Sequence, residues 1–273
     1  MFHWTDYIHP PVSRAQIVLT IHDLAFAHDE SWHGPNARVL RDRTATAASR
    51  AAAIITPSQA TADDVARLLP DAVRPQVIPF GSDHVPKTQP PRLGAFQADY
   101  VLCIGTIEPR KNHLNLLRAM RLLPDPRPQL IVVGGRGWEC DNIADELRAA
   151  EHDGLIRWLE SADDATVFAL MAHARALVYP SLWEGFGFPP LEAMAMGTPV
   201  VAHDCAPLRE LTDGAAALTD ARKPEALAEA LTLVQQNPDL RQQLIDKGLA
   251  RAGCFSWRAC AAAHADLYRE VAT

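Results

Sequence analysis

Residues 179–201 read YPSLWEGFGFPPLEAMAMGTPVV, and this stretch decides how the rest of the chain is interpreted. A short apolar run that ends at Tyr179 predicts a buried strand, and Pro180 ends it. Pro189 is typical of a helix start because its φ is fixed, and Gly197 predicts the helix end. A strand, a glycine-containing loop and a helix in this order predict a βα unit of an α/β fold.

The loop between this strand and helix has the composition of a ligand-binding segment. Two glycines, Gly185 and Gly187, let backbone amides approach a ligand because no Cβ stands in the way. Glu192 is expected in the first helical turn, where hydroxyl groups and a nearby phosphate are favourable ligands. For an isolated pair, the simpler interpretation is that Glu192 complements the helix dipole and Glu184 is a solvated loop residue.

The run from Glu184 to Glu192, with Gly185, Phe186 and Gly187 inside it, resembles the signature of a known enzyme family. That family is the retaining glycosyltransferases of the GT-B fold, family four (glycosyl transferases group 1). The resemblance implies two Rossmann-like domains with parallel sheets. It also implies that Glu184 faces the donor sugar and that Glu192 holds the nucleotide ribose. The backbone of Gly185, Phe186 and Gly187 would lie along the sugar and diphosphate.

A second candidate residue stands at the end of the first readable strand, residues 16–21. This β-branched run ends at His22, and ligands of α/β sheets gather at such strand ends. A lone histidine there is more often a structural hydrogen-bonding residue. The sequence His-Asp-Leu at this place resembles the same glycosyltransferases, in which the histidine lies beside the anomeric carbon and the diphosphate. The resemblance therefore implies that His22 and Glu184 are the catalytic residues.

The strand of residues 100–104 leads into a third candidate segment. Two cations in the loop after it, Arg110 and Lys111, could neutralise a diphosphate and the charge that it gains on leaving. An adjacent Arg-Lys pair is more often a surface feature. The context Gly-Thr-x-Glu-Pro-Arg-Lys-Asn resembles the phosphate-binding loop of the family and implies donor binding by Gly105, Thr106, Arg110 and Lys111.

The chain contains no Asp-x-Asp, the carboxylate pair that many metal-dependent glycosyltransferases use. We therefore expect no metal and no cofactor besides the donor substrate, with protein cations in the place of Mg²⁺.

Composition limits the classes of partner. The chain has 273 residues, 48% hydrophobic content and a net charge of −7. The length and the hydrophobic content predict two globular domains. The negative charge predicts that they do not bind nucleic acid. Five spread cysteines form no Cys-x-x-Cys pair and predict neither disulfides nor a zinc site. No window is a signal peptide or a membrane span, so a cytoplasmic protein is expected, with loose peripheral membrane association left open. The oligomeric state is not determined by the sequence.

The expected domain organisation follows the resemblance and a proline-rich stretch. It comprises a partial amino-terminal, acceptor-side domain (1–85), a linker (86–95), a nucleotide-sugar-binding domain (96–257) and a terminal helix that packs back on the first domain (258–273). Relatives begin with more βα units, so the first sheet should have only two or three strands and expose an edge and an apolar face. Pro224 predicts one long helix that ends before Gly253.

The resemblance implies a retaining hexosyltransferase of polysaccharide biosynthesis. The donor would be a nucleoside diphosphate sugar, with mannose from GDP-mannose favoured, and the acceptor would be a glycan or a lipid-linked glycan. The alternative is a truncated, non-catalytic remnant that binds nucleotide sugars. A sugar-nucleotide epimerase on the same fold is the less favoured third interpretation, because the glutamate pair with Gly-Phe-Gly belongs to the transferases.

Overall fold

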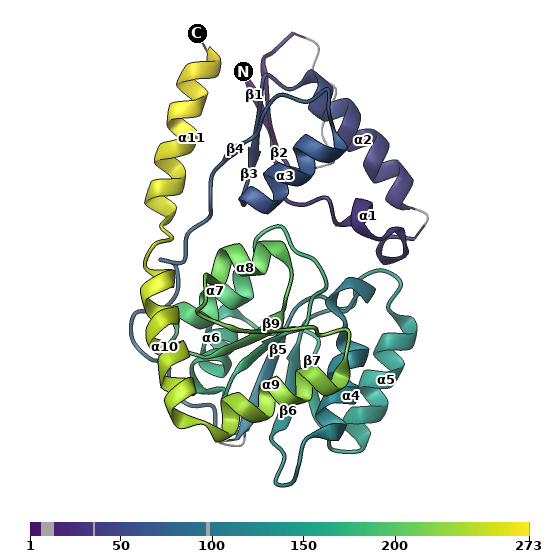
Figure 1. Ribbon diagram of the computed structural model, residues 1–273, viewed down its shortest axis with the longest axis vertical. Helices are drawn as coiled ribbons and strands as arrows, with labels where there is room; N and C mark the ends of the chain where they lie inside the picture. Colours follow the sequence, from purple (N-terminus) through teal and green to yellow (C-terminus); the bar gives the residue numbers. More distant parts are fainter. Residues whose placement is uncertain (7–13, 35, 97–98, 273) are drawn as a thin grey trace. The chain divides into compact units, whose positions relative to one another are not determined.

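The computed structural model describes residues 1–6, 14–34, 36–96 and 99–272. Its contacts divide the chain into two units, whose elements are drawn in Figure 1. Unit 1 comprises Met1–Gly81, Glu184–Phe186 and Phe255–Thr273, and unit 2 comprises Ser82–Trp183 and Gly187–Cys254. Each unit contains one parallel sheet with helices, which confirms the predicted fold class.

Within the described part of unit 1, the sheet has four parallel strands in the order β1-β2-β3-β4. Their bounds are Phe2–Trp4, Ile17–Thr20, Ala53–Thr56 and Gln76–Val77. The predicted strand of residues 16–21 is β2, and the expectation of only two or three strands was wrong because β1 adds a fourth. Three residues are too few to show a hydrophobic period, and β1 is recognisable only through its pairing with β2.

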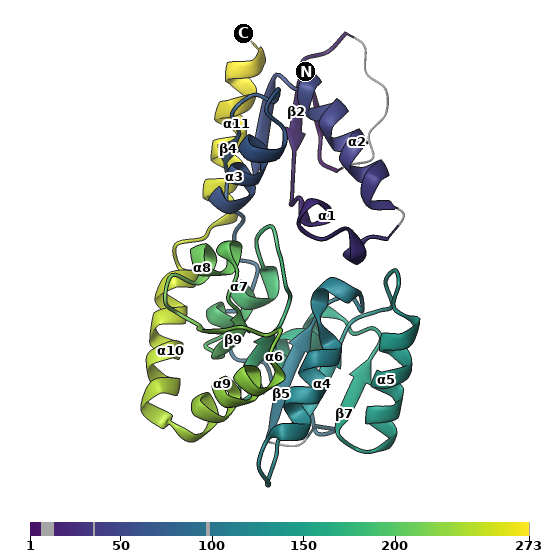
Figure 2. The same ribbon diagram turned by 45° about the vertical axis from the view of Figure 1, so that its right-hand side comes forward.

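Helices cover both faces of the small sheet. Its helical elements are α1 (Ala25–His28), η1 (Glu30–Trp32), α2 (Asn36–Arg50), α3 (Gln59–Leu68) and α11 (Trp257–Ala272). Ile17 and Leu19 of β2 pack in the same cluster as alanines of α2, whereas Val18 packs with Cys260 and Leu267 of α11. Figure 2 shows α11 running alongside this sheet. The expectation of an uncovered apolar face was therefore wrong, because α11 buries it.

In unit 2, the residues that the structure describes form a parallel sheet of six strands in the order β10-β9-β8-β5-β6-β7. The strands are β5 (Tyr100–Ile104), β6 (Gln129–Val133), β7 (Ile156–Leu159), β8 (Leu177–Tyr179), β9 (Val200–His203) and β10 (Ala217–Thr219). Central strands such as β5 and β6 are nearly continuous apolar runs, as expected for a parallel sheet that is buried on both faces.

The helices of unit 2 alternate with these strands. They are η2 (Pro109–Lys111), α4 (His113–Leu122), α5 (Asp141–His152), α6 (Asp164–His173), α7 (Phe188–Ala195), α8 (Ala206–Thr212), α9 (Pro224–Gln236) and α10 (Pro238–Ala252). The predicted single helix from Pro224 was wrong. Pro238 cannot continue a helix, and the Asn237 side chain instead caps α10 by accepting a hydrogen bond from the Leu240 amide at 2.9 Å. Among the described residues, no helix combines the length and the apolar character that crossing a membrane requires.

The strand order of unit 2 reverses at β5. The chain proceeds from β5 to β6 and β7 on one side, then returns to place β8 on the other side of β5. The carboxyl ends of β5 and β8 therefore form a topological switch point, the place where open α/β sheets bind ligands.

Candidate functional site

Two of the predicted loops begin side by side at this switch point. The segment from Gly105 to Lys111 follows β5, and the segment from Pro180 to Trp183 follows β8. The Leu182 amide donates to the Arg110 carbonyl at 2.9 Å, which ties the two loops together. The structure thus brings the predicted phosphate-binding loop next to the chain that leads into Glu184.

The Lys111 side chain is held at the end of β8. Its Nζ lies 3.1 Å from the Tyr179 hydroxyl and 5.3 Å from the centre of that ring. Its stem passes over Gly105, where a Cβ would be 3.6 Å from Lys111 Cδ. Thr106, the next residue, is exposed. A cation and a hydroxyl group therefore stand at the switch point, as a diphosphate site requires. Tyr179 was not predicted, because an aromatic residue at a strand end looks like core.

Arg110 is buried and has partners of its own. Its Nη2 lies 2.9 Å from Glu108 Oε1, and its Nη1 donates to the Trp183 carbonyl at 2.5 Å. Burying a guanidinium group requires such pairing, because an unpaired buried charge costs several kcal/mol. In this structure Arg110 therefore holds the backbone of Trp183, the residue directly before Glu184. Its contact with a diphosphate stays a prediction. Glu108, the ion-pair partner of Arg110, was not predicted as a site residue although it lies within the recognised motif.

Glu192 lies deeper in its helix than expected. The helix α7 begins at Phe188 after Gly187, whose φ is 107°, so Glu192 is its fifth residue and not in the first turn. The expectation was wrong because the helix starts one residue before Pro189. Glu192 Oε1 lies 3.0 Å from His84 Nε2. His84 was not predicted, since no local pattern connects residues so far apart in the sequence.

Gly185 belongs to unit 1, where its backbone packs against the end of β2 and the start of α3. Its carbonyl accepts hydrogen bonds from the Ser58 hydroxyl at 2.6 Å and from the Thr61 hydroxyl at 3.3 Å. A Cβ at residue 185 would lie 1.8 Å from the His22 carbonyl oxygen. Only glycine fits this approach. The structure therefore brings Gly185 to His22, and the Glu184 side chain beside them is buried.

The His22 ring has a defined orientation. Its Nε2 lies 2.9 Å from the Thr5 carbonyl, which can only accept, so Nε2 is the donor. In the neutral ring the lone pair is then on Nδ1, which fixes the atom that His22 can offer to a ligand. The proposed catalytic role of His22 stays a prediction.

The Phe186 side chain lies in an aromatic cluster formed by Phe80, Phe186, Phe255 and Trp257. The ring centre of Phe80 lies 5.3 Å from that of Phe186 and 5.7 Å from that of Trp257. The ring centre of Phe255 lies 5.8 Å from that of Phe186. Phe186 is only 6% exposed, so its side chain anchors the loop and its backbone is the part that a ligand can meet.

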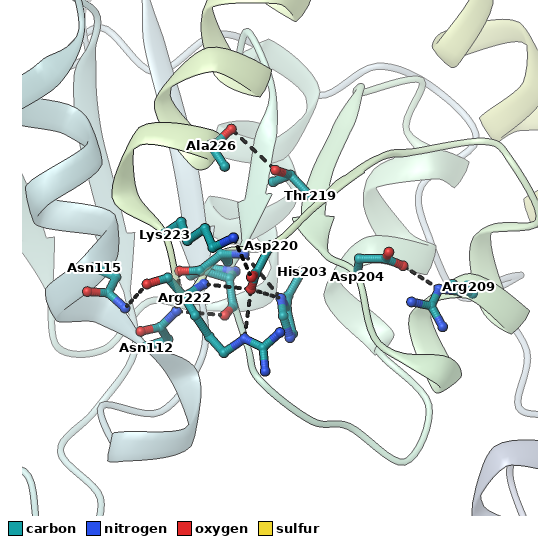
Figure 3. A network of polar contacts seen from close by, with 12 residues as sticks. Asn112, Asn115, His203, Asp204, Arg209, Thr219, Asp220, Arg222, Lys223 and Ala226 are labelled. Carbon is teal, nitrogen blue, oxygen red and sulfur yellow. Dashed lines mark hydrogen bonds and ion pairs between the residues drawn. The ribbon is translucent and has the colours of Figure 1, made fainter.

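A polar network braces the loops of unit 2 from the side of β9 and β10 (Figure 3). Asn112, in the left-handed conformation at φ 60°, donates to the carbonyls of Ala221 at 2.8 Å and Pro180 at 3.3 Å. His203 Nδ1 accepts from the Ala221 amide at 3.2 Å. Burial and the nearby Arg222 guanidinium lower the pKa of His203, so the ring stays a neutral acceptor. This network fixes the chain directly after Lys111.

The predicted site residues fall into two sets. Unit 1 holds His22, Glu184, Gly185 and Phe186, and unit 2 holds Gly105, Thr106, Arg110, Lys111, Gly187 and Glu192. Within the described ranges, no group of three or more His, Cys, Asp or Glu side chains is arranged to hold a metal ion.

Comparisons with known proteins agree with this geometry. Residues 89–251 match the model of the family described as glycosyl transferases group 1. The chain is 31% identical over 285 residues to the O-antigen chain mannosyltransferase B of Escherichia coli, and the alignment covers 97% of this chain and 75% of that protein. It is 32% identical over 154 residues to the serotype-specific mannosyltransferase WbdA of Escherichia coli, which covers 53% of this chain but only 19% of that protein.

A solved structure shares the fold. The chain superposes on Anabaena Alr3699/HepE, solved in complex with UDP and glucose, with a TM-score of 0.79 over 94% of this chain and 72% of the other. The sequences are 21% identical, so this likeness concerns the fold alone.

Proposed function

The chain belongs to the glycosyl transferases group 1 family, and from this premise we propose that it is a retaining mannosyltransferase of polysaccharide biosynthesis. The donor would be a nucleoside diphosphate hexose, with GDP-mannose first, and the acceptor would be a glycan or a lipid-linked glycan. The observation that carries the proposal is the pairing of the Gly105–Lys111 loop with the loop after Tyr179 at the switch point of unit 2.

The proposed reaction separates charge between the diphosphate and the sugar ring, and the residues of the site can stabilise both. As the bond from C1 of the sugar to the leaving phosphate oxygen breaks, negative charge grows on the diphosphate and the ring becomes oxocarbenium-like. Lys111 and the backbone amide of Thr106 would stabilise the leaving diphosphate, whereas the Gly105 amide donates to the Val133 carbonyl at 3.0 Å and Gly105 contributes its lack of a side chain. His22 and Glu184 would hold the sugar, and the acceptor hydroxyl oxygen would bond to C1 on the face that the diphosphate leaves, while the hydroxyl proton passes to the leaving phosphate oxygen. The anomeric configuration is then retained.

The test is a transfer assay with GDP-mannose and UDP-glucose in parallel and with glycan and lipid-linked acceptors. Mass spectrometry reports the product, and NMR reports the anomeric configuration of the new bond. Glu192→Ala should lower nucleotide-sugar affinity and turnover, whereas the exposed Glu146→Ala on α5 should change neither. An inverted product would refute retention. Nucleotide-sugar binding without transfer to any acceptor would favour the non-catalytic alternative.

We further propose that catalysis needs no metal ion, because protein cations take the place of Mg²⁺ at the diphosphate. Addition of EDTA should leave the turnover number unchanged. Loss of turnover with EDTA and its recovery with Mg²⁺ would refute this part.

A cytoplasmic location with peripheral membrane association completes the proposal, since lipid-linked acceptors are held at a membrane. Fractionation of cells that express the tagged chain would test both parts. Recovery of the chain outside the cytoplasmic and membrane fractions would contradict them.

A further inference from the structure

The surface of unit 2 has an open groove where α9 packs against α4 (Figure 2). The groove has a volume of about 560 Å³ and is lined by α9, by the end of α4 and by Asn237. Leu122 of α4 and Leu233 of α9 both line it, with exposed fractions of 54% and 52%. Two large apolar side chains that share one open groove favour a binding surface, because a partner that covers them removes apolar area from water.

The charged residues of the groove are both acidic. Glu225 and Glu229 line it, and all of the other lining residues are uncharged. Within the described ranges, neither of these carboxylates forms an ion pair. Covering a carboxylate without supplying a cation is unfavourable. The groove therefore suits a surface that presents a basic group beside an apolar one.

The spacing on α9 defines this surface further. Glu229 and Leu233 are four residues apart, so they lie on one face of the helix and about 6 Å apart along its axis. The acidic group is nearer the amino end of α9, and the apolar group is nearer the carboxyl end. A helix that lies antiparallel in the groove should have an apolar residue first and a basic residue four positions later.

Helix α2 of unit 1 carries this pattern. Val39 is 46% exposed, and Arg43 follows four residues later on the same face. Arg43 is exposed, and no described residue forms an ion pair with it. Arg38 and Asp42 are the neighbouring charged residues of α2, and their charges cancel. With the helices antiparallel, Val39 would meet Leu233 and Arg43 would meet Glu229.

The other exposed apolar residues of the described helices do not fit the groove. Outside the groove, large and exposed apolar side chains on these helices belong to Val39, Leu249 and Trp257. Neither Leu249 nor Trp257 has a basic residue three or four positions away. Val39 is therefore the candidate that combines the apolar contact with the required cation.

We propose that this chain associates with a second copy of itself, with α2 of one copy lying antiparallel in the α4–α9 groove of the other. Two different patches meet in this contact, so it is heterologous. It closes as a dimer when each copy fills the groove of the other, and it forms longer assemblies when the contact is not reciprocated. The contact is independent of the proposed transferase activity.

The test is sedimentation velocity of the full chain at concentrations from about 10 to 500 μM, the range that suits a small interface. Arg43→Glu and Glu229→Arg should each weaken self-association at least about tenfold, because each change places like charges together. With both changes in one chain, the opposite charges meet again in exchanged positions. Self-association of this double variant should return to within about threefold of wild type.

The matched controls are Arg74→Glu and Glu146→Arg. They make the same changes of charge at exposed residues outside both helices, so they should associate as wild type does. Leu233→Ser removes the apolar contact and should weaken association at least about threefold. All of these residues are exposed, so the melting temperatures of the variants should match that of wild type.

A wild-type chain that stays monomeric over the whole range would overturn the proposal. So would wild-type association in Arg43→Glu or Glu229→Arg, or a double variant that associates no better than the single ones. Association that Leu233→Ser weakens but Arg43→Glu does not would show that another surface fills the groove, which also refutes the docking of α2.

Discussion

The close approach of Gly185 to the His22 carbonyl leads to a specific prediction for the loop of residues 184–187. In Gly185→Ala the new Cβ would meet the His22 carbonyl oxygen at 1.8 Å, and real Cβ contacts stay beyond 3.0 Å. The contact must therefore lengthen by about 1.2 Å. The obstructing atom belongs to the backbone, at the end of β2, where the Ile21 amide donates to the Ile55 carbonyl at 2.9 Å. It cannot rotate away as the tip of a side chain would.

The expected cost follows from this displacement. Overpacking typically costs about 1–3 kcal/mol, and each of the two hydrogen bonds to the Gly185 carbonyl contributes about 0.5–1.5 kcal/mol. We expect the unfolding free energy to fall by about 2–6 kcal/mol if both hydrogen bonds are lost, which is on the order of 10 °C in melting temperature. Turnover should fall as well, because Glu184 moves with the loop.

Differential scanning calorimetry of wild type, Gly185→Ala and Gly94→Ala measures this effect. Gly94 is the matched control, because no atom lies within 4 Å of a Cβ built there. A Gly185→Ala protein that melts and turns over like Gly94→Ala would refute the reasoning.

The remaining predictions concern three side chains of unit 2. Burial lowers the pKa of His113 to about 3, so the unfolded chain binds a proton that the folded chain does not as the pH falls below about 6.5. Stability should drop by about 2 kcal/mol from this residue at pH 5, and His113→Met should remove that loss in urea titrations at pH 5 and pH 8. Equal losses in both proteins would contradict it. Lys111→Ala should weaken nucleotide-sugar binding at least about tenfold in calorimetry, and the exposed Lys87→Ala should not; equal affinities would remove the diphosphate role. His84→Ala should change the same affinity by about threefold to tenfold, because it releases the Glu192 carboxylate; no change would show that the His84 contact is without consequence.

The order of elements could be predicted because its signals are local. Buried strands such as β5 and β6 are nearly continuous apolar runs, and glycines and prolines mark where such runs end. The positions of the loops at strand ends followed from this pattern. The two wrong predictions of secondary structure also have local causes. Strand β1 is too short to show a hydrophobic period, and the helical pattern continues on both sides of Pro238, where one helix ends and α10 begins.

The partners of the site residues could not be predicted in this way. Arg110 donates to the Trp183 carbonyl, Glu192 pairs with His84, and α11 covers one face of the first sheet. A salt bridge or a packed face joins segments that are distant in the sequence, and it leaves no periodic trace in either segment.

The sequence by itself determined the α/β class, the strands that end at Ile104 and Tyr179 and the loops after them that carry candidate residues, because backbone propensity and hydrophobic period are properties of short segments. Only the tertiary structure decided that Gly185 touches the His22 carbonyl and that His84 lies beside the Glu192 carboxylate. Those facts depend on how closely packed segments approach one another, which no single segment encodes.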